Sequence, residues 1–369
     1  MNRLILIGNG FDLAHGMKTS YKDFIADYLC QAVNTFFEES IYEDDLISIS
    51  FKYSGHFFSE KPIPKKHDEI FDYLPNLINN TNFKFNIDSL LLKNTLKNID
   101  KYNWVDLETE YFNVLLATKQ VYKNNNQNEA IKKVNDQLFY LKSRLNDYLQ
   151  IQQWQFSNLY NREPLVNCFT DKIYNHEMVL LDLEENIIPE KLYFLNFNYT
   201  NTFEDYRRPC NTIVHSDFNY IHGGLGGVHG DPIFGFGDEL DKRFLEFEDE
   251  KNNELFKHIK SFEYLKTKNY YLLTRFIESN DFQVHIYGHS CGLSDRTMLN
   301  QIFEHENCKS IKIFYHRKSD GTNDYTEKTY EISRHFKDKG MMRKKVVPFD
   351  LSREMPQPEI DKRFTTKSL

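Results

Sequence analysis

The chain has 369 residues, of which 40% are hydrophobic and 27% charged, a composition that is typical of globular proteins and too apolar for a disordered one. Lys and Arg number 46 against 54 Asp and Glu, and the resulting net charge of −8 disfavours non-specific binding to a nucleic-acid duplex. Because no apolar run approaches the ~18 residues of a membrane span and the apolar start is too short for a signal peptide, we expect a cytoplasmic protein that contacts neither membrane nor nucleic acid.

The five cysteines are odd in number and contain no CxxC pair: Cys30, Cys168, Cys210, Cys291 and Cys308. Neither a disulfide framework nor a four-thiolate zinc site is therefore expected, and the pattern is typical of a reducing compartment. His222, His229 and Asp231 are candidate metal ligands, but their spacing matches no zinc motif, so we expect no metal.

The first predicted element is a strand at residues 3–7, a run of branched aliphatics that ends at a glycine and is typical of a buried parallel strand. A helix is predicted from residue 21. Apolar residues at intervals of three and four predict a long helix over 130–150, and another helical pattern begins at 104–108. We therefore interpret residues 31–189 as a large, mainly helical insertion.

Strand patterns return at 192–197, 220–221, 283–287 and 311–314, with one long helix predicted between the second and third, over 253–278. Strands that alternate with helices predict an α/β fold, a Rossmann-like parallel sheet with helices on both faces. The expected domains are a discontinuous nucleotide-binding domain, 1–30 and 190–345, the helical insertion, and a loosely ordered tail, 346–369.

The first motif is the glycine-rich loop after the opening strand, with Gly8, Asn9, Gly10, Asp12 and Gly16. Glycines between a strand and a helix allow a phosphate to approach the backbone and the helix N-terminus. The spacing is GxGxxxxxG and not the GxGxxG of dehydrogenases. A plain turn explains the same glycines, and Asp12 could either cap a helix or accept a ribose hydroxyl.

Two further motifs follow predicted strands, where open α/β sheets bind their ligands. The segment 196–202 is rich in Asn and Thr, so Asn198 could hold a hydroxyl or a water, although a helix cap would use the same residues. His222 precedes Gly223, which leaves room beside the imidazole, and histidine is the natural general base at neutral pH. A structural histidine is the alternative.

The fourth motif runs from Gly288 through Ser290 to Asp295 and has two interpretations. It is either a second phosphate or ribose loop, or a GxSxG nucleophile elbow with Ser290 as the nucleophile of a serine hydrolase. The acid and base of such a hydrolase would have to come from Asp320 or Asp324 and from His335.

Together the four segments resemble the bacteriophage abortive infection family AbiH. The matching stretches are LILIGNGFDLAHGMKTSYKDF, FLNFNYTNTF, YIHGG and IYGHSCGLSDRTMLNQIF. The layout is also similar, more distantly, to sirtuin-like NAD-binding domains, which have a GAG loop, an Asn-Ile/Tyr-Asp segment, a His-Gly pair and a Gly-x-Ser loop. In this comparison Asp12 stands in place of Ser and Thr200 in place of Asp, and the paired cysteines of deacetylating sirtuins are absent.

The resemblance implies a phage-defence protein that binds NAD or a related nucleotide and hydrolyses its nicotinamide–ribose bond. His222 would be the base and Asn198 would position the sugar. The expected ligand contacts are Gly8, Asn9, Gly10, Asp12, Gly16, Tyr199, Gly223, Gly288, Ser290 and Asp295. A nucleotide-sensing module without turnover is the alternative, and homo-oligomer formation stays open.

Overall fold

The structure, a computed structural model, describes residues 1–52, 69–80, 82–102, 106–121, 125–156 and 160–359. The chain divides into two compact units. Unit 1 consists of Met1–Met17, Leu149–Glu248 and Ile259–Leu369, and unit 2 consists of Lys18–Tyr148 and Asp249–His258. In the part of the chain that the structure describes, no helix has both the length and the apolar character to cross a membrane.

Unit 1 is built on a six-stranded sheet in which every strand pair is parallel. Its strands are β1 (Asn2–Ile7), β5 (Leu192–Asn196), β6 (Ser216–Tyr220), β7 (Phe282–Tyr287), β8 (Cys308–Tyr315) and β9 (Arg353–Glu354). All six residues of β1 and all six of β7 are buried, as expected for strands that are covered on both faces. The predicted α/β fold with a parallel sheet is confirmed.

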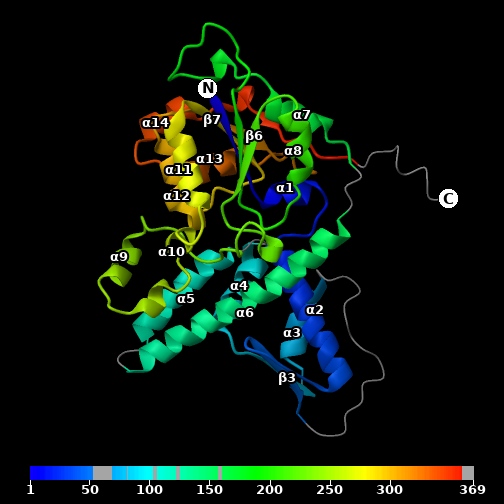
Figure 1. Cartoon of the computed structure of the whole chain (residues 1–369). Coiled ribbons are helices and arrows are strands. Elements are labelled where there is room, and N and C mark those ends of the chain that lie inside the picture. Colours follow the sequence, from blue (N-terminus) through cyan, green and yellow to red (C-terminus); the bar gives the residue numbers. More distant parts are fainter. Residues whose placement is uncertain (53–68, 81, 103–105, 122–124, 157–159, 360–369) are drawn as a thin grey trace, which may run out of the picture. The chain divides into compact units, whose positions relative to one another are not determined.

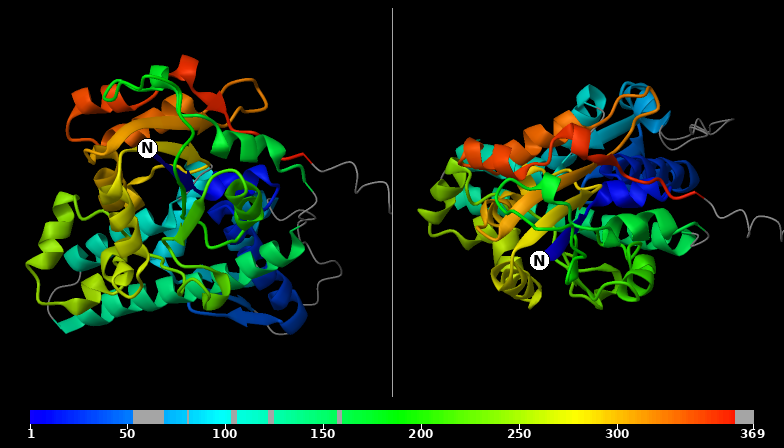
Figure 2. Two further views of the ribbon diagram at one scale, coloured as in Figure 1. Left: turned by 45° about the horizontal axis from the view of Figure 1, so that its top comes forward. Right: turned by 90° about the horizontal axis from the view of Figure 1, so that it is seen from above.

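Helices cover both faces of this sheet. One face packs on α11 (Asn269–Ser279), α12 (Arg296–Glu304), α13 (Tyr325–Arg334) and α14 (Lys339–Lys345). The other packs on α1 (Asn9–Ala14), α7 (Glu163–Thr170) and α8 (Glu204–Asn211). Figure 1 labels these helices, and Figure 2 shows the yellow-to-orange helices and the green helices on opposite sides of the sheet. The short helices α9 (Lys242–Glu248) and α10 (Lys260–Tyr264) lie in the connection between β6 and β7.

The strand order β6-β5-β1-β7-β8-β9 places the first strand in the middle of the sheet. The chain builds outward from β1 through β5 to β6, then returns to the other side of β1 to form β7 and β8. This is the 3-2-1-4-5-6 order of the doubly wound nucleotide-binding fold, whose direction reverses between the first and fourth strands. The point of reversal is therefore the carboxyl ends of β1 and β7.

Unit 2 is mainly helical, and its helices include α2 (Tyr21–Glu39), α3 (Ile70–Ile78), α4 (Leu90–Tyr102), α5 (Leu107–Val121) and most of α6 (Asn125–Gln155). Helix α2 begins with a reciprocal capping box between Ser20 and Asp23. The unit also contains an antiparallel sheet of β2 (Ile41–Glu43), β3 (Ile47–Phe51) and β4 (Phe83–Ile87), which the sequence did not predict. Trp104 and Val105, expected at a helix start, lie outside the described residues.

The single helix predicted over 253–278 is wrong. The structure has three shorter pieces, the 3-10 helix η4 (Asn253–Phe256), α10 and α11. Ile259 is extended (φ −95°, ψ 121°) and forms a parallel bridge with Phe236, which ends the helical run before α10. Beyond residue 346 the chain still contributes to the sheet, because Arg353 and Glu354 of β9 pair with β8.

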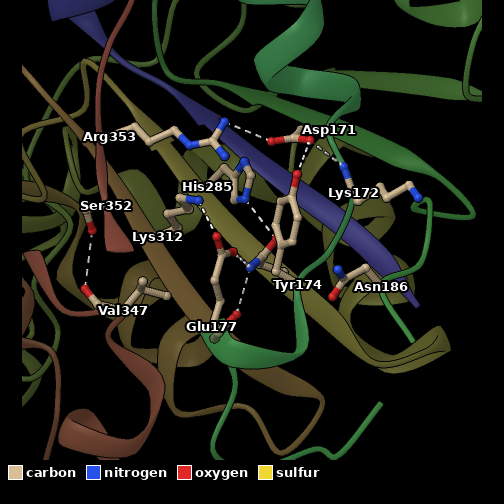
Figure 3. A network of polar contacts seen from close by, with 12 residues as sticks. Asp171, Lys172, Tyr174, Glu177, Asn186, His285, Lys312, Val347, Ser352 and Arg353 are labelled. Atoms are coloured by element: carbon tan, nitrogen blue, oxygen red, sulfur yellow. Dashed lines mark hydrogen bonds and ion pairs between the residues drawn. The ribbon is translucent and has the colours of Figure 1, made fainter. Parts of the chain in front are cut away.

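Buried polar side chains fill the amino-terminal half of one sheet face, which the aliphatic strand patterns did not predict. They are Arg3, Glu177, Gln283, His285 and Lys312. Lys312 forms an ion pair with Glu177, whose second oxygen accepts from Gln283 Nε2 at 2.9 Å (Figure 3). Gln283 Oε1 in turn lies 2.8 Å from His285 Nε2 and 3.2 Å from an Arg3 nitrogen. This network lies at the end of the strands opposite to the predicted ligand edge.

Candidate functional site

The four sequence motifs meet at the carboxyl edge of the unit 1 sheet, as predicted. Asn198 Nδ2 donates to the Gly8 carbonyl at 3.1 Å, and the Gly10 amide donates to the Gly288 carbonyl at 2.8 Å. His222 Nδ1 lies 3.2 Å from the Phe197 carbonyl oxygen. Segments that are up to 280 residues apart in sequence thus share one site, at the point where the strand order reverses.

The glycines of the first and fourth motifs let two loops pack backbone against backbone. A Cβ added to Gly8 would lie 2.4 Å from His289 Cα, and one added to Gly288 would lie 2.1 Å from the Phe11 nitrogen. Gly288 also has φ +67°, a conformation that L side chains rarely adopt. The amides of Gly8 and Gly10 donate to the carbonyls of Tyr287 and Gly288. Loop packing therefore accounts for these glycines, and their two amides are engaged within the protein.

His222 is buried at the end of β6, with 4% of its surface exposed. Because a carbonyl can only accept, Nδ1 carries the proton that bonds to Phe197, so the lone pair of the neutral ring is on Nε2. Nε2 lies 3.0 Å from the Tyr264 hydroxyl and 3.2 Å from Asp295 Oδ1. Burial lowers the pKa of His222, and the nearby Lys260 lowers it further, against the opposite effect of Asp295. The imidazole is thus a neutral base with its lone pair directed at a hydroxyl.

Asp295 is the centre of a group of buried charges. Its Oδ1 lies 2.8 Å from Lys260 Nζ, and its Oδ2 lies 3.7 Å from His289 Nε2. Burial disfavours the carboxylate, but the Lys260 ammonium outweighs burial and holds the pKa of Asp295 well below its usual range. Burial lowers the pKa of His289 to about 3, and its Nδ1 accepts from the Cys291 amide, so this ring is neutral as well.

Lys260 and Tyr264 both come from α10, in the long connection between β6 and β7. The Lys260 amide donates to the Phe236 carbonyl, continuing the bridge between Phe236 and Ile259. A Cβ on Gly237 would lie 2.5 Å from the Ser294 carbonyl oxygen, so this connection is packed directly on the Asp295 loop. The Tyr264 ring is parallel to the His222 ring, with 6.0 Å between centroids. Helix α10 therefore covers the base in this structure.

Asp12 lies beneath the first loop and is bonded to the second. It is 1% exposed, and its Oδ2 accepts from the Thr200 hydroxyl at 2.5 Å, while its buried Oδ1 has no hydrogen-bond partner. Burial raises the pKa of Asp12 to about 6. The bond between the Thr200 hydroxyl and the Asp12 carboxylate joins the first and second motifs.

Comparison with known proteins identifies the chain. The sequence model of one family, described as bacteriophage abortive infection AbiH, matches residues 4–317. The chain belongs to the AbiH family. The matched region includes every motif residue of the site, and no curated protein matches the chain. Family membership places this AbiH protein among phage-defence proteins that act by abortive infection.

The alternative catalytic centre, a serine-hydrolase triad, is not assembled in this AbiH chain. Ser290 is exposed, but His335 Nε2 lies 2.7 Å from the Cys291 carbonyl and not at the serine. Asp320 accepts from Thr322, and Asp324 accepts from the His316 amide, so neither carboxylate orients His335. The non-glycine residue with positive φ in this loop is Cys291, at +56°, and not Ser290.

The remaining predicted residues of the AbiH site lie at its rim or shape its backbone. Asn9 and Gly16 are exposed and Tyr199 is half-buried, with its hydroxyl donating to the Ile233 carbonyl at 2.8 Å. Gly223 has φ +70°, and a Cβ there would lie 2.2 Å from the Asp231 carbonyl oxygen. His229 stacks on Tyr220. Within the described ranges, no group of three or more His, Cys, Asp or Glu side chains could hold a metal ion.

Sequence reasoning missed three residues of the site, Lys260, Tyr264 and His289. His289 lies inside the fourth motif and could have been found there, since it is next to Ser290. Lys260 and Tyr264 have no motif of their own, and the sequence pattern places them in an ordinary long helix.

Proposed function

We propose that this AbiH protein acts in phage defence by binding NAD or a closely related dinucleotide at the carboxyl edge of the unit 1 sheet and hydrolysing its nicotinamide–ribose bond. The observation that carries the proposal is the position of His222 and Asn198 at the reversal of the strand order, where doubly wound sheets bind dinucleotides. The exposed or half-buried rim residues Asn9, Tyr199 and Ser290 would contact the ligand. Gly8 and Gly10 shape the loop.

The chemistry needs few groups because nicotinamide is a cationic leaving group. The bond between ribose C1′ and the ring nitrogen breaks with its electron pair going to the ring, which leaves as neutral nicotinamide. A water oxygen forms the new bond to C1′ and gives its proton to His222 Nε2, which holds the lone pair in the neutral ring. The protonated ring can then donate to Asp295 Oδ1, which lies 3.2 Å from Nε2 in the structure. The Tyr264 hydroxyl occupies the position that the attacking water would take, so the Tyr264 side chain must move for turnover.

The same burial favours the second candidate, a nucleotide sensor without turnover. His222 is 4% exposed and Nε2 already faces a hydroxyl, so a ligand at the rim does not reach the ring in this conformation. The two candidates differ in one product, since only the enzyme releases nicotinamide.

The test is release of nicotinamide and ADP-ribose from NAD by the purified protein, with NAD levels and plaque counts measured in cells under phage challenge. His222→Ala should reduce turnover by ~100-fold or more while NAD binding persists, in line with the usual contribution of a general base. His215→Ala is the matched control, because His215 lies in unit 1 with a 65% exposed side chain beside Asp217. If His222→Ala still consumes NAD as the wild type does, the catalytic assignment is wrong. Protection with unchanged NAD favours the sensor.

A further inference from the structure

His222 has a carboxylate beside the nitrogen that must stay unprotonated. Asp295 Oδ1 is 3.2 Å from Nε2, and both side chains are at least nine-tenths buried. A carboxylate so close to an imidazole favours the imidazolium, which has no lone pair to accept a proton. Asp295 alone would therefore remove the base that the proposed reaction requires.

Lys260 lies on the other side of the same carboxylate oxygen. Its side chain is fully buried, and Nζ is 2.8 Å from Asp295 Oδ1 and 3.3 Å from the Ser294 carbonyl oxygen. The ammonium balances the Asp295 charge and repels a proton on His222. Burial lowers the pKa of His222 below its ordinary value, and Lys260 and Asp295 act on the imidazole with opposite signs.

The other titratable groups around His222 do not compensate the charge of Asp295 as Lys260 does. In the described part of the chain, the groups that face His222, directly or through a neighbour, are Tyr199, Lys260, Tyr264, His289, Asp295 and Lys328. Tyrosine hydroxyls ordinarily carry no charge near neutral pH. His289 is held neutral by burial, and Lys328 Nζ bonds to the His289 carbonyl at 2.9 Å and not to Asp295. Lys260 is the cation in direct contact with the Asp295 carboxylate.

We propose that Lys260 is a positioning residue that keeps His222 as a neutral proton acceptor by neutralising Asp295. The proposal deepens the proposed function and rests on His222 being its base. Lys260 itself need not touch the substrate. Its effect is electrostatic, so it is visible in the titration of His222 even where no turnover is measured.

The decisive measurement is the titration of His222 by NMR in selectively histidine-labelled full-length protein, with the signal assigned from the His222→Gln variant. Lys260→Met keeps much of the side-chain volume and removes the charge, so the pKa of His222 should rise above that of the wild type. Asp295→Asn keeps the lysine and removes the carboxylate, so the pKa should fall below that of the wild type. In the variant with both Lys260→Met and Asp295→Asn, the pKa of His222 should be lower than in Lys260→Met alone.

Lys345→Met is the matched control. Lys345 is also a buried lysine of unit 1, 2% exposed, but its Nζ bonds to the carbonyls of Phe303 and His305 and not to the site. This variant should lose stability and leave the His222 titration unchanged. A folded Lys260→Met protein with a wild-type His222 titration overturns the proposal. If Lys260→Met does not fold, Asp295→Asn decides, and an unchanged His222 pKa in that variant overturns the proposal.

The pH profile of turnover provides the second readout. At pH 7, the loss of NAD hydrolysis in Lys260→Met should equal the fall in the neutral fraction of His222 that the NMR titration of this variant shows, roughly threefold if the pKa rises by about one unit from the ordinary 6.5. The loss should be largely recovered at pH 9, where His222 is again neutral, which a merely structural defect would not allow. If the His222 titrations follow the expected order but the wild type hydrolyses no NAD, the role of Lys260 stands and the proposed function fails.

Discussion

Replacing Asp12 with Asn should stabilise the protein at neutral pH, although it alters a buried hydrogen bond. Asp12 is 1% exposed and its Oδ1 has no partner, and burial raises its pKa from 3.8 to about 6. Ionisation of this carboxyl therefore opposes folding. Each pKa unit corresponds to about 1.4 kcal/mol, so the penalty above pH 6 is about 3 kcal/mol. This penalty disappears as the pH falls from 6 toward 3.8, because Asp12 then becomes protonated in both the folded and the unfolded chain.

The net gain is smaller, because Asn accepts more weakly from Thr200 than a carboxylate does, a difference of about 1 kcal/mol. We expect Asp12→Asn to be more stable than the wild type by about 2 kcal/mol at pH 8, with little gain left at pH 4.5. Differential scanning calorimetry should show a midpoint raised by roughly 2–4 °C for each kcal/mol in a unit of this size. Asp136→Asn, which removes a surface ion pair with Lys257, should show no pH-dependent gain. Equal destabilisation of Asp12→Asn at both pH values would refute the reasoning.

Three further outcomes test the structure. Gly288→Ala should unfold at a clearly lower temperature than Gly321→Ala, since both glycines have positive φ but a Cβ on Gly288 meets the Phe11 nitrogen at 2.1 Å whereas Gly321 faces open space; equal midpoints would contradict the loop packing. Lys312→Met should cost roughly 3–5 kcal/mol in chemical denaturation because it leaves Glu177 as a buried unpaired charge, and adding Glu177→Gln should recover part of the loss. Elemental analysis of chelator-treated protein should find less than one zinc per chain, since the sequence has no paired cysteines; a stoichiometric value would redirect attention to His222 and His229.

The frame of the site could be predicted from sequence because each motif follows a run of buried aliphatics. Residues 3–7 and 283–287 read as interior strands, and the ends of parallel strands lie on one edge of a sheet. That rule alone brings Gly8, His222 and Gly288 together. It uses only local pattern and chain direction, both of which are present in a single sequence.

The position of α10 over the site could not be predicted from the sequence, because long-range contacts determine it. Residues 253–278 have helical composition, yet a bridge from Ile259 to the distant Phe236 breaks the helix and turns Lys260 inward. Likewise, a glycine suited to a phosphate and one suited to a neighbouring loop look the same in sequence. Only the positions of His289 and Phe11 decide that Gly8 and Gly288 serve loop packing.

Because β1 lies in the centre of the sheet, it is synthesised long before the two strands that pair with it. Arg3 pairs with Leu192 on one side and with Gln283 on the other, so β1 has neither neighbour until far more of the chain has been made. At ribosomal rates of about 5–20 residues per second, the wait for β7 is roughly 15–60 s. During this time an aliphatic strand with two open edges is exposed to other nascent chains and to chaperones. A chain whose translation stops before residue 282 has no β7 and therefore lacks half of the loop pair that forms the site.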